Sequence, residues 1–143
     1  MRTLKAFASV AVVMVVFDLI FLGYLATDFY DSRLGPLRGE TIVWAAALFY
    51  LQYVAVITWY AVLPSTSVKQ AAIRGLGIGW VAYATYELTN MAVIAGWPAE
   101  LIPYDIAWGL VLTTGVSSIS WMITGAPAEV SDAALSSPAR KID

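Results

Sequence analysis

Cysteine and histidine are both absent from this chain of 143 residues. Their absence excludes disulfides, thiolate or imidazole metal sites, a Cys or Ser–His nucleophile system and the usual histidine-ligated haem. We therefore predict no cofactor, with haem and zinc the groups that are most clearly disfavoured. Any functional site has to be built from carboxylates, amides, hydroxyls and aromatic rings.

Charged residues are also scarce. They make up 13% of the chain and hydrophobic residues 60%, whereas soluble domains carry about 25% and about 45–50%. One soluble core could not bury this apolar surplus without leaving large sticky patches on the surface. The composition therefore predicts an integral membrane protein, with the lipid bilayer as a partner. The net charge of −2 and the scattered Lys and Arg residues do not favour nucleic acid as a partner.

A helix needs about 20 residues to cross about 30 Å of hydrocarbon, and four apolar runs are about this long. They cover residues 4–26, 41–63, 71–95 and 104–124, and turn-forming residues separate them. Because the connections are short, neighbouring helices should be antiparallel. We predict an all-α fold in which residues 1–124 form an integral membrane four-helix bundle. Residues 125–143 contain too few apolar side chains to order themselves and should form a disordered tail.

Arg2 and Lys5 precede the first apolar run, as basic residues do in a secretory signal peptide. The run itself is longer than the about 7–15 apolar residues of a signal peptide, and it lacks a small-residue cleavage site at its end. It also carries Asp18. We interpret it as a retained transmembrane helix.

The distribution of basic residues predicts the orientation in the membrane. Six of the eight lie on one side of the four predicted spans, and the other two, Arg33 and Arg38, lie on the opposite side. The six are Arg2, Lys5, Lys69, Arg74, Arg140 and Lys141. Since cytoplasmic segments collect Lys and Arg, both termini and the tail should be cytoplasmic.

Two acidic residues lie well inside the predicted spans. Asp18 and Glu87 are each eight residues from the outer end of their run, or about 12 Å deep at about 1.5 Å per residue. An ionisable side chain inside a membrane helix costs about 2.5–3.5 kcal/mol, so both should face the protein interior and mark a site. Asp105, at the outer boundary of the fourth run, is either a helix cap or part of the same site, or both.

The third run carries a polar stripe at helical spacing. Gly75, Gly79, Tyr83, Glu87 and Asn90 share one face of a helix. The two glycines let another backbone approach closely, while the tyrosine and the asparagine place a hydroxyl and an amide beside the acid.

Two further residues are candidates for the same site. Gln52, in the middle of the second run, is costly at mid-membrane unless it has a partner. Trp108 lies near the carboxylates in the predicted bundle, as do Tyr83 and Tyr86, and a cation–π role is open to all three. Most of the other aromatic residues are typical of the membrane interface.

The segment from Tyr83 to Gly109 contains the patterns Y-E-L-T-N, W-P and D-I-A-W-G. In these patterns the chain resembles the bacterial membrane-protein family known as domain of unknown function 2177, over roughly residues 4–124. Glu87 stands where the family pattern usually has Asp, and Phe21 where it has Trp. The resemblance implies a multi-pass protein of the bacterial inner membrane, and it implies no activity, because none is assigned to the family. It also places Asp18, Glu87, Asn90 and Asp105 on pattern positions.

Three functions remain open from the sequence. The first is binding or transport of a proton or cation, through carboxylates that open to the outer face and cannot both be ionised cheaply when close together. The second is an accessory or assembly subunit whose buried acids are purely structural. The third, an intramembrane enzyme, is less favoured because no Arg or Lys lies near the acids to hold a phosphate, and we assign no catalytic residue. A homodimer or another membrane subunit is a candidate partner.

The predicted topology can be tested with a reporter fused after Asp143. The reporter should be active on the cytoplasmic side, because six of the eight basic residues lie there. A periplasmic C-terminus would contradict this orientation and the placement of the acids in the outer half.

Overall fold

The computed structural model describes residues 1–37 and 39–127, and all regular secondary structure within them is helical. The expected disordered tail lies, from residue 128 onward, outside the described residues. The elements are α1 (Arg2–Ile20), the π-helical turn η1 (Phe21–Leu25), α2 (Thr27–Leu34), the 3-10 turn η2 (Gly35–Leu37), α3 (Val43–Val56), the π-helical turn η3 (Ile57–Val62), α4 (Val68–Val93) and α5 (Leu101–Thr124).

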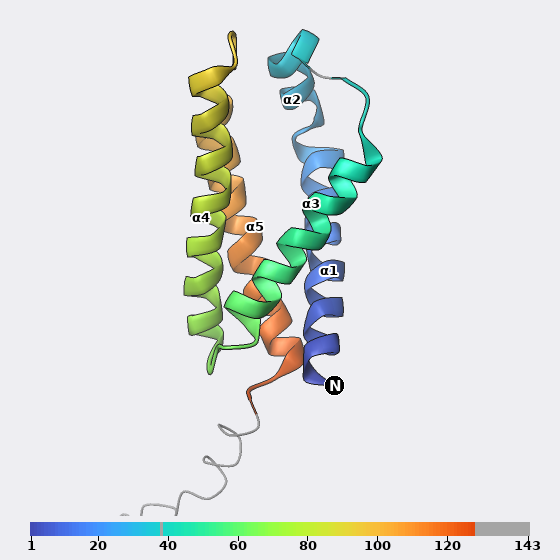
Figure 1. Ribbon diagram of the computed structural model, residues 1–143, viewed down its shortest axis with the longest axis vertical. Coiled ribbons are helices and arrows are strands. Elements are labelled where there is room, and N and C mark those ends of the chain that lie inside the picture. The colour runs from blue at the N-terminus through green and yellow to red at the C-terminus, as the bar shows by residue number, and fades with distance from the viewer. Residues whose placement is uncertain (38, 128–143) are drawn as a thin grey trace, which may run out of the picture.

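The long helices lie side by side in an elongated molecule (Figure 1). Helices α1, α4 and α5 follow the long axis, and α3 crosses obliquely in front of them. The short helix α2 and the connection between α4 and α5 lie at one end, which we call the α2 end. The N-terminus and the last turn of α5 lie at the other, which we call the Arg2 end. A membrane normal along the long axis would place these two ends on opposite sides.

Three stretches of the described chain are long and apolar enough to cross a membrane. They are Arg2–Leu25, Val43–Val62 and Leu101–Thr124. Many large apolar side chains on their outer faces are more than half exposed, among them Leu19, Leu51 and Val111, as suits contact with lipid. Helix α4 is longer still, at 26 residues, but it is less apolar because its inner face carries glycines and polar groups.

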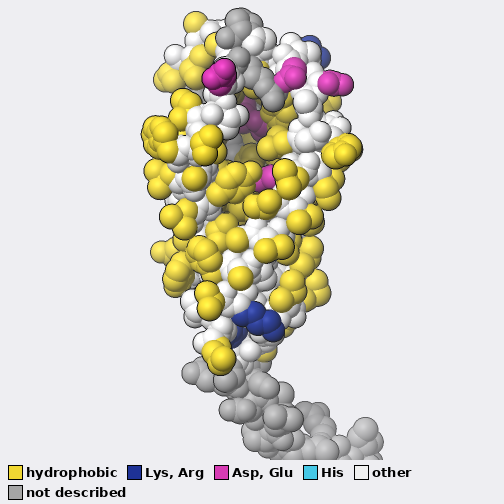
Figure 2. All heavy atoms as spheres, turned by 90° about the vertical axis from the view of Figure 1, so that its right-hand side faces the viewer, with side chains coloured by type: hydrophobic (Ala, Val, Ile, Leu, Met, Phe, Trp, Pro, Cys, Tyr) yellow, Lys and Arg dark blue, Asp and Glu magenta, His cyan; other side chains and the backbone are white. Residues whose placement is uncertain are grey.

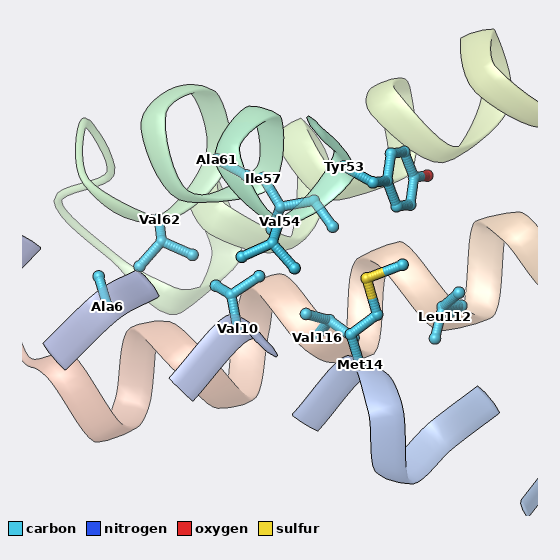
Figure 3. Close-up of a cluster of buried hydrophobic side chains, with 10 residues drawn as sticks. All are labelled: Ala6, Val10, Met14, Tyr53, Val54, Ile57, Ala61, Val62, Leu112 and Val116. Carbon is cyan, nitrogen blue, oxygen red and sulfur yellow. The ribbon is translucent and has the colours of Figure 1, made fainter. Parts of the chain in front are cut away.

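The apolar core joins α1, α3 with η3, and α5 (Figure 3). On α1 the buried residues recur at every fourth position, as Ala6, Val10 and Met14, and Asp18 continues the same inner stripe. Tyr53, Val54, Ile57, Ala61, Val62, Leu112 and Val116 complete the cluster. Because Asp18 continues this buried stripe, the one acidic residue of α1 lies in the protein interior.

Helix α4 packs against α5 through small residues. A Cβ atom added to Gly75 would lie 2.6 Å from the Thr113 carbonyl oxygen, and one added to Gly79 would collide with the Gly109 carbonyl. The two backbones therefore touch, as the glycine spacing predicts. Gly77, on the same helix, has open space around it.

At the Arg2 end a single guanidinium connects three segments. Arg2 donates from Nη1 to the Leu63 carbonyl, at 2.9 Å, and from Nη2 to the Gly125 carbonyl, at 3.1 Å. These carbonyls follow η3 and α5, where helix ends leave acceptors without intrahelical partners and carry partial negative charge. Arg2 thus fixes the start of α1 to the ends of two other helices.

The close α4–α5 packing can be tested by adding one methyl group. Gly79→Ala should destabilise the protein by about 1–3 kcal/mol, because the new Cβ has to push the Gly109 backbone away. Gly77→Ala is the matched control: it lies on the same helix with open space around it and should leave stability unchanged or raise it. Thermal unfolding of both variants in one detergent measures the difference. Equal stability of the two variants would contradict backbone contact between the helices.

Candidate functional site

Three acidic side chains are buried toward the α2 end. Asp18 is 6% exposed, Glu87 is fully buried and Asp105 is 7% exposed. They come from the inner faces of α1, α4 and α5, respectively. Figure 2 shows acidic side chains around and inside a hollow in the upper half of the molecule. Helix α1, which is far from α4 and α5 in the sequence, thus brings its acid to the same region as theirs.

Glu87 has one firm hydrogen bond and one oxygen without a partner. The indole Nε1 of Trp97 donates to Glu87 Oε2 at 3.0 Å. Gly96, with a φ of +80°, turns the chain after α4 so that Trp97 folds back toward Glu87; a left-handed φ of this kind favours glycine. The other oxygen, Oε1, is buried and has no hydrogen-bond partner among the described residues.

The side chain beside Glu87 is Asp105, within hydrogen-bonding reach. The sequence left open whether Asp105 is a helix cap. Helix α5 begins earlier than expected, at Leu101, and no acidic residue lies in its first turn. Asp105 therefore lies on the buried face of the helix and belongs to the acidic site.

Helix α2 supplies a partner that sequence reasoning missed. The Tyr30 hydroxyl donates to Asp105 Oδ1. Burial first, and then the bond to Asp105, raise the pKa of the Tyr30 phenol above its ordinary value, so it remains a neutral donor. The exposed ion pair of Arg33 with Glu100, at 3.0 Å, also joins α2 to the start of α5 but contributes little stability in water. The one sequence signal for Tyr30 is that, with Leu34 and Gly35, it resembles a further part of the family pattern.

Asp18 has a separate set of neighbours. It lies against the hydroxyl of Tyr50 and the indole of Trp108. The Phe21 ring stacks on Trp108, with 3.8 Å between centroids and 5° between planes. The Trp108 Nε1 is buried without a well-formed hydrogen bond to any described residue. An acceptor near this N–H would therefore be stabilised.

A cavity of about 380 Å³ connects Asp18 with Asp105. Tyr83 lies close enough to both acids for their charges to act on its hydroxyl group. The side chains that line the cavity are Asp18, Leu22, Tyr30, Phe49, Tyr50, Ala82, Tyr83, Tyr86, Asp105 and Trp108. The lining thus contains two acids, several aromatic rings and no Lys or Arg.

The structure brings together most of the residues predicted for the site, with two differences. Glu87 pairs with Asp105, where the sequence suggested Asp18 as its partner at equal depth. Asn90 is partly exposed and lies beside Tyr86, one turn beyond Glu87, with no contact to an acid among its described interactions.

Gln52, which the sequence analysis named as a candidate for the buried site, lies elsewhere. Its side chain is exposed and lines a second hollow, together with Tyr60 and Arg74. The inner face of α3 is formed by residues such as Tyr53 and Val54, which are buried. Since neighbouring residues on a helix point about 100° apart, Gln52 faces outward.

The donor set is poor in metal ligands. Within residues 1–37 and 39–127, no group of three or more Asp or Glu side chains converges as a metal site would require. The carboxyl pair of Glu87 and Asp105 suits a proton, and the cavity between Asp18 and Asp105 suits positive charge.

Across residues 1–37 and 39–127 the regular structure is helical, the exterior is apolar, three stretches can cross a bilayer and acids are buried on inner helix faces. These features are those of a membrane protein. The chain belongs to the family described as predicted membrane protein (DUF2177), whose model matches residues 3–122. This confirms the resemblance found in the sequence. Searches of the curated proteins and of the solved structures gave no match.

The bond from α2 to the acids can be tested by removing one hydroxyl. Tyr30→Phe should destabilise the protein by about 1–3 kcal/mol, because the buried Asp105 loses a donor that nothing replaces. Tyr24→Phe is the control, since Tyr24 is almost fully exposed and its loss should have no effect. The measurement is thermal unfolding in lipid nanodiscs. If Tyr30→Phe is as stable as Tyr24→Phe, the Tyr30 bond does not hold Asp105.

Proposed function

We propose that this protein binds a proton and a cation at buried carboxyl groups in the outer half of a four-span domain of the bacterial inner membrane. The observation that carries the proposal is the contact of Glu87 with Asp105, in which a fully buried side chain keeps one oxygen without a donor. The proton and the cation occupy neighbouring positions that share Asp105.

The proton occupies the carboxyl pair. Two ionised carboxylates are acceptors only, so they cannot hydrogen-bond to each other, and their charges repel strongly at low dielectric. One proton held between Glu87 and Asp105 removes a charge and supplies the donor that Oε1 lacks. The bonds from Trp97 and Tyr30 occupy the other oxygens and hold both carboxyl groups in place.

The cation occupies the cavity. Asp18 and Asp105 line it without a compensating Lys or Arg, so the cavity attracts positive charge. A cation in this cavity favours the ionised form of Asp105, and so promotes loss of the shared proton. Binding of the cation and release of the proton are therefore linked.

The proposed arrangement in the membrane is supported by α4 and by the basic residues near its start. Helix α4 is about 39 Å long at about 1.5 Å per residue, packs along the candidate span α5, and exposes apolar side chains such as Ile73, Trp80 and Val93. These features support α4 as a fourth span. Lys69 and Arg74, near its start, fit a cytoplasmic Arg2 end with the cavity toward the outer side.

A second function is favoured by the exposed Gln52. An amide on the outward face of a predicted span calls for a polar partner, which another subunit or a second copy of the chain would supply. In that case the protein is an accessory or assembly subunit, and its acids are structural. An enzyme is less favoured, because no Lys or Arg lines the cavity to hold a phosphate.

The proton can be tested by neutral substitution in the pair. Thermal stability of the wild type in nanodiscs should fall as pH rises. The folded pair holds a proton at a pH at which the separated carboxylates of the unfolded chain have lost theirs, so this proton stabilises the fold only at lower pH. Glu87→Gln supplies a permanent N–H donor to Asp105 and should make stability less dependent on pH than in the wild type, with higher stability than the wild type at alkaline pH.

Asp28→Asn is the matched control, since Asp28 is an exposed acid on α2, and its pH profile should follow the wild type. The same profile for wild type and Glu87→Gln would show that the pair holds no extra proton. The accessory-subunit function would then be preferred.

A further inference from the structure

We infer that the cation is an organic ammonium ion with an apolar body, which reaches the cavity through the side of the molecule that faces lipid. The inference rests on the proposed cation binding and names the class of ligand. It depends on what lines the cavity, on its size and on the position of its mouth.

The lining suits an alkylated ammonium better than a metal ion. Six of the ten lining side chains are aromatic, namely Tyr30, Phe49, Tyr50, Tyr83, Tyr86 and Trp108. Aromatic faces attract cations, most strongly where water is excluded. Calcium ions take about six to eight oxygen ligands, and the cavity offers two carboxyl groups at separate positions.

The size of the cavity leads to the same ligand class. Its volume of about 380 Å³ lies within the range of about 300–1,000 Å³ that is typical of small-molecule sites. A water molecule occupies about 30 Å³ in the liquid, so a single inorganic ion would leave most of the cavity unfilled. Leu22 and Ala82 add apolar surface to the rings. An apolar body fills this space, and its charged group stays near an acid.

Asp18 is the acid that best receives the charged group. It is nearly buried, its neighbours Tyr50 and Trp108 are fixed by packing, and it is not engaged in the carboxyl pair. Phe21 stacks on one face of Trp108, and the indole also lines the cavity. Asp105 lies at the other side of the cavity and within hydrogen-bonding reach of Glu87. The positive charge of the ligand therefore weakens the binding of the proton that Asp105 shares with Glu87.

The mouth of the cavity opens on the flank of the molecule. Leu22 and Phe49 are each 45% exposed and Tyr86 is 54% exposed, although all three line the cavity. Figure 2 shows the hollow on the long side of the molecule, with apolar side chains below and beside it and acidic side chains above and inside it. On a protein that lies in a bilayer along its long axis, this flank meets the hydrocarbon. A ligand that enters here needs an apolar body, as amphiphilic amines have.

The experiment compares benzyltrimethylammonium with neopentylbenzene, in which a carbon atom replaces the charged nitrogen. Full-length protein in nanodiscs is titrated with each compound, and separately with Na⁺, K⁺ and Mg²⁺, and the rise in melting temperature is recorded. Only the ammonium compound should give a saturable rise. Asp18→Asn should weaken its binding at least about tenfold, and Asp28→Asn should leave it unchanged.

Phe49→Leu is a second variant that tests the rings. Phe49 is nearly half exposed, so the substitution keeps an apolar side chain and should not disturb folding. It should weaken binding of the ammonium compound severalfold, and it should leave the pH profile of the carboxyl pair unchanged.

The outcomes separate this inference from the proposed function. Stabilisation by Na⁺, K⁺ or Mg²⁺ alone would overturn the organic ligand and leave cation binding in place. Equal binding of neopentylbenzene would show an apolar site without charge recognition and would overturn the inference. No effect of any cation, together with a flat pH profile for the wild type, would overturn the proposed function as well.

Discussion

Backbone contact between α4 and α5 is the constraint on which the acidic site depends. Gly79 lies against Gly109, and the Gly109 Cα faces the Tyr83 ring. In this antiparallel register Glu87, two turns beyond Gly79, meets Asp105, one turn before Gly109. A larger residue at either glycine would separate the helices and the two acids. The small residues therefore determine how close two charges come in a medium that opposes charge.

Polar groups are distributed unevenly between the two ends of the molecule. At the Arg2 end a guanidinium binds carbonyls that follow two helices. At the α2 end an indole and a phenol bind carboxyl groups. In hydrocarbon a polar group without a partner costs several kcal/mol, so the partners come from the chain itself. The connections carry much of this role, since Trp97 and Tyr30 both lie outside the long helices.

The sequence was sufficient for the helical class and the family, and for the inner stripe of α4. It could not give the faces of the other helices, because a membrane helix is apolar outside as well as inside and so has little amphipathic contrast. Residue counts give the position of a side chain along a helix, but not its rotation about the helix axis. Asp18 was for this reason expected to pair with Glu87, and Gln52 was expected inside. Helix α2, with eight mostly polar residues between two runs, carries too little apolar periodicity to be recognised.

The most consequential feature is that Asp105 takes part in two arrangements at once. It lies within hydrogen-bonding reach of Glu87, and it lines the same cavity as Asp18. In the proposed function, a positive charge in the cavity and a proton on the pair both reduce the negative charge near Asp105, so each weakens the binding of the other. By thermodynamic linkage the two effects are equal in size. A cavity lined by Asp18 alone would bind a cation without this dependence on pH, and a carboxyl pair remote from the cavity would bind a proton without responding to a ligand.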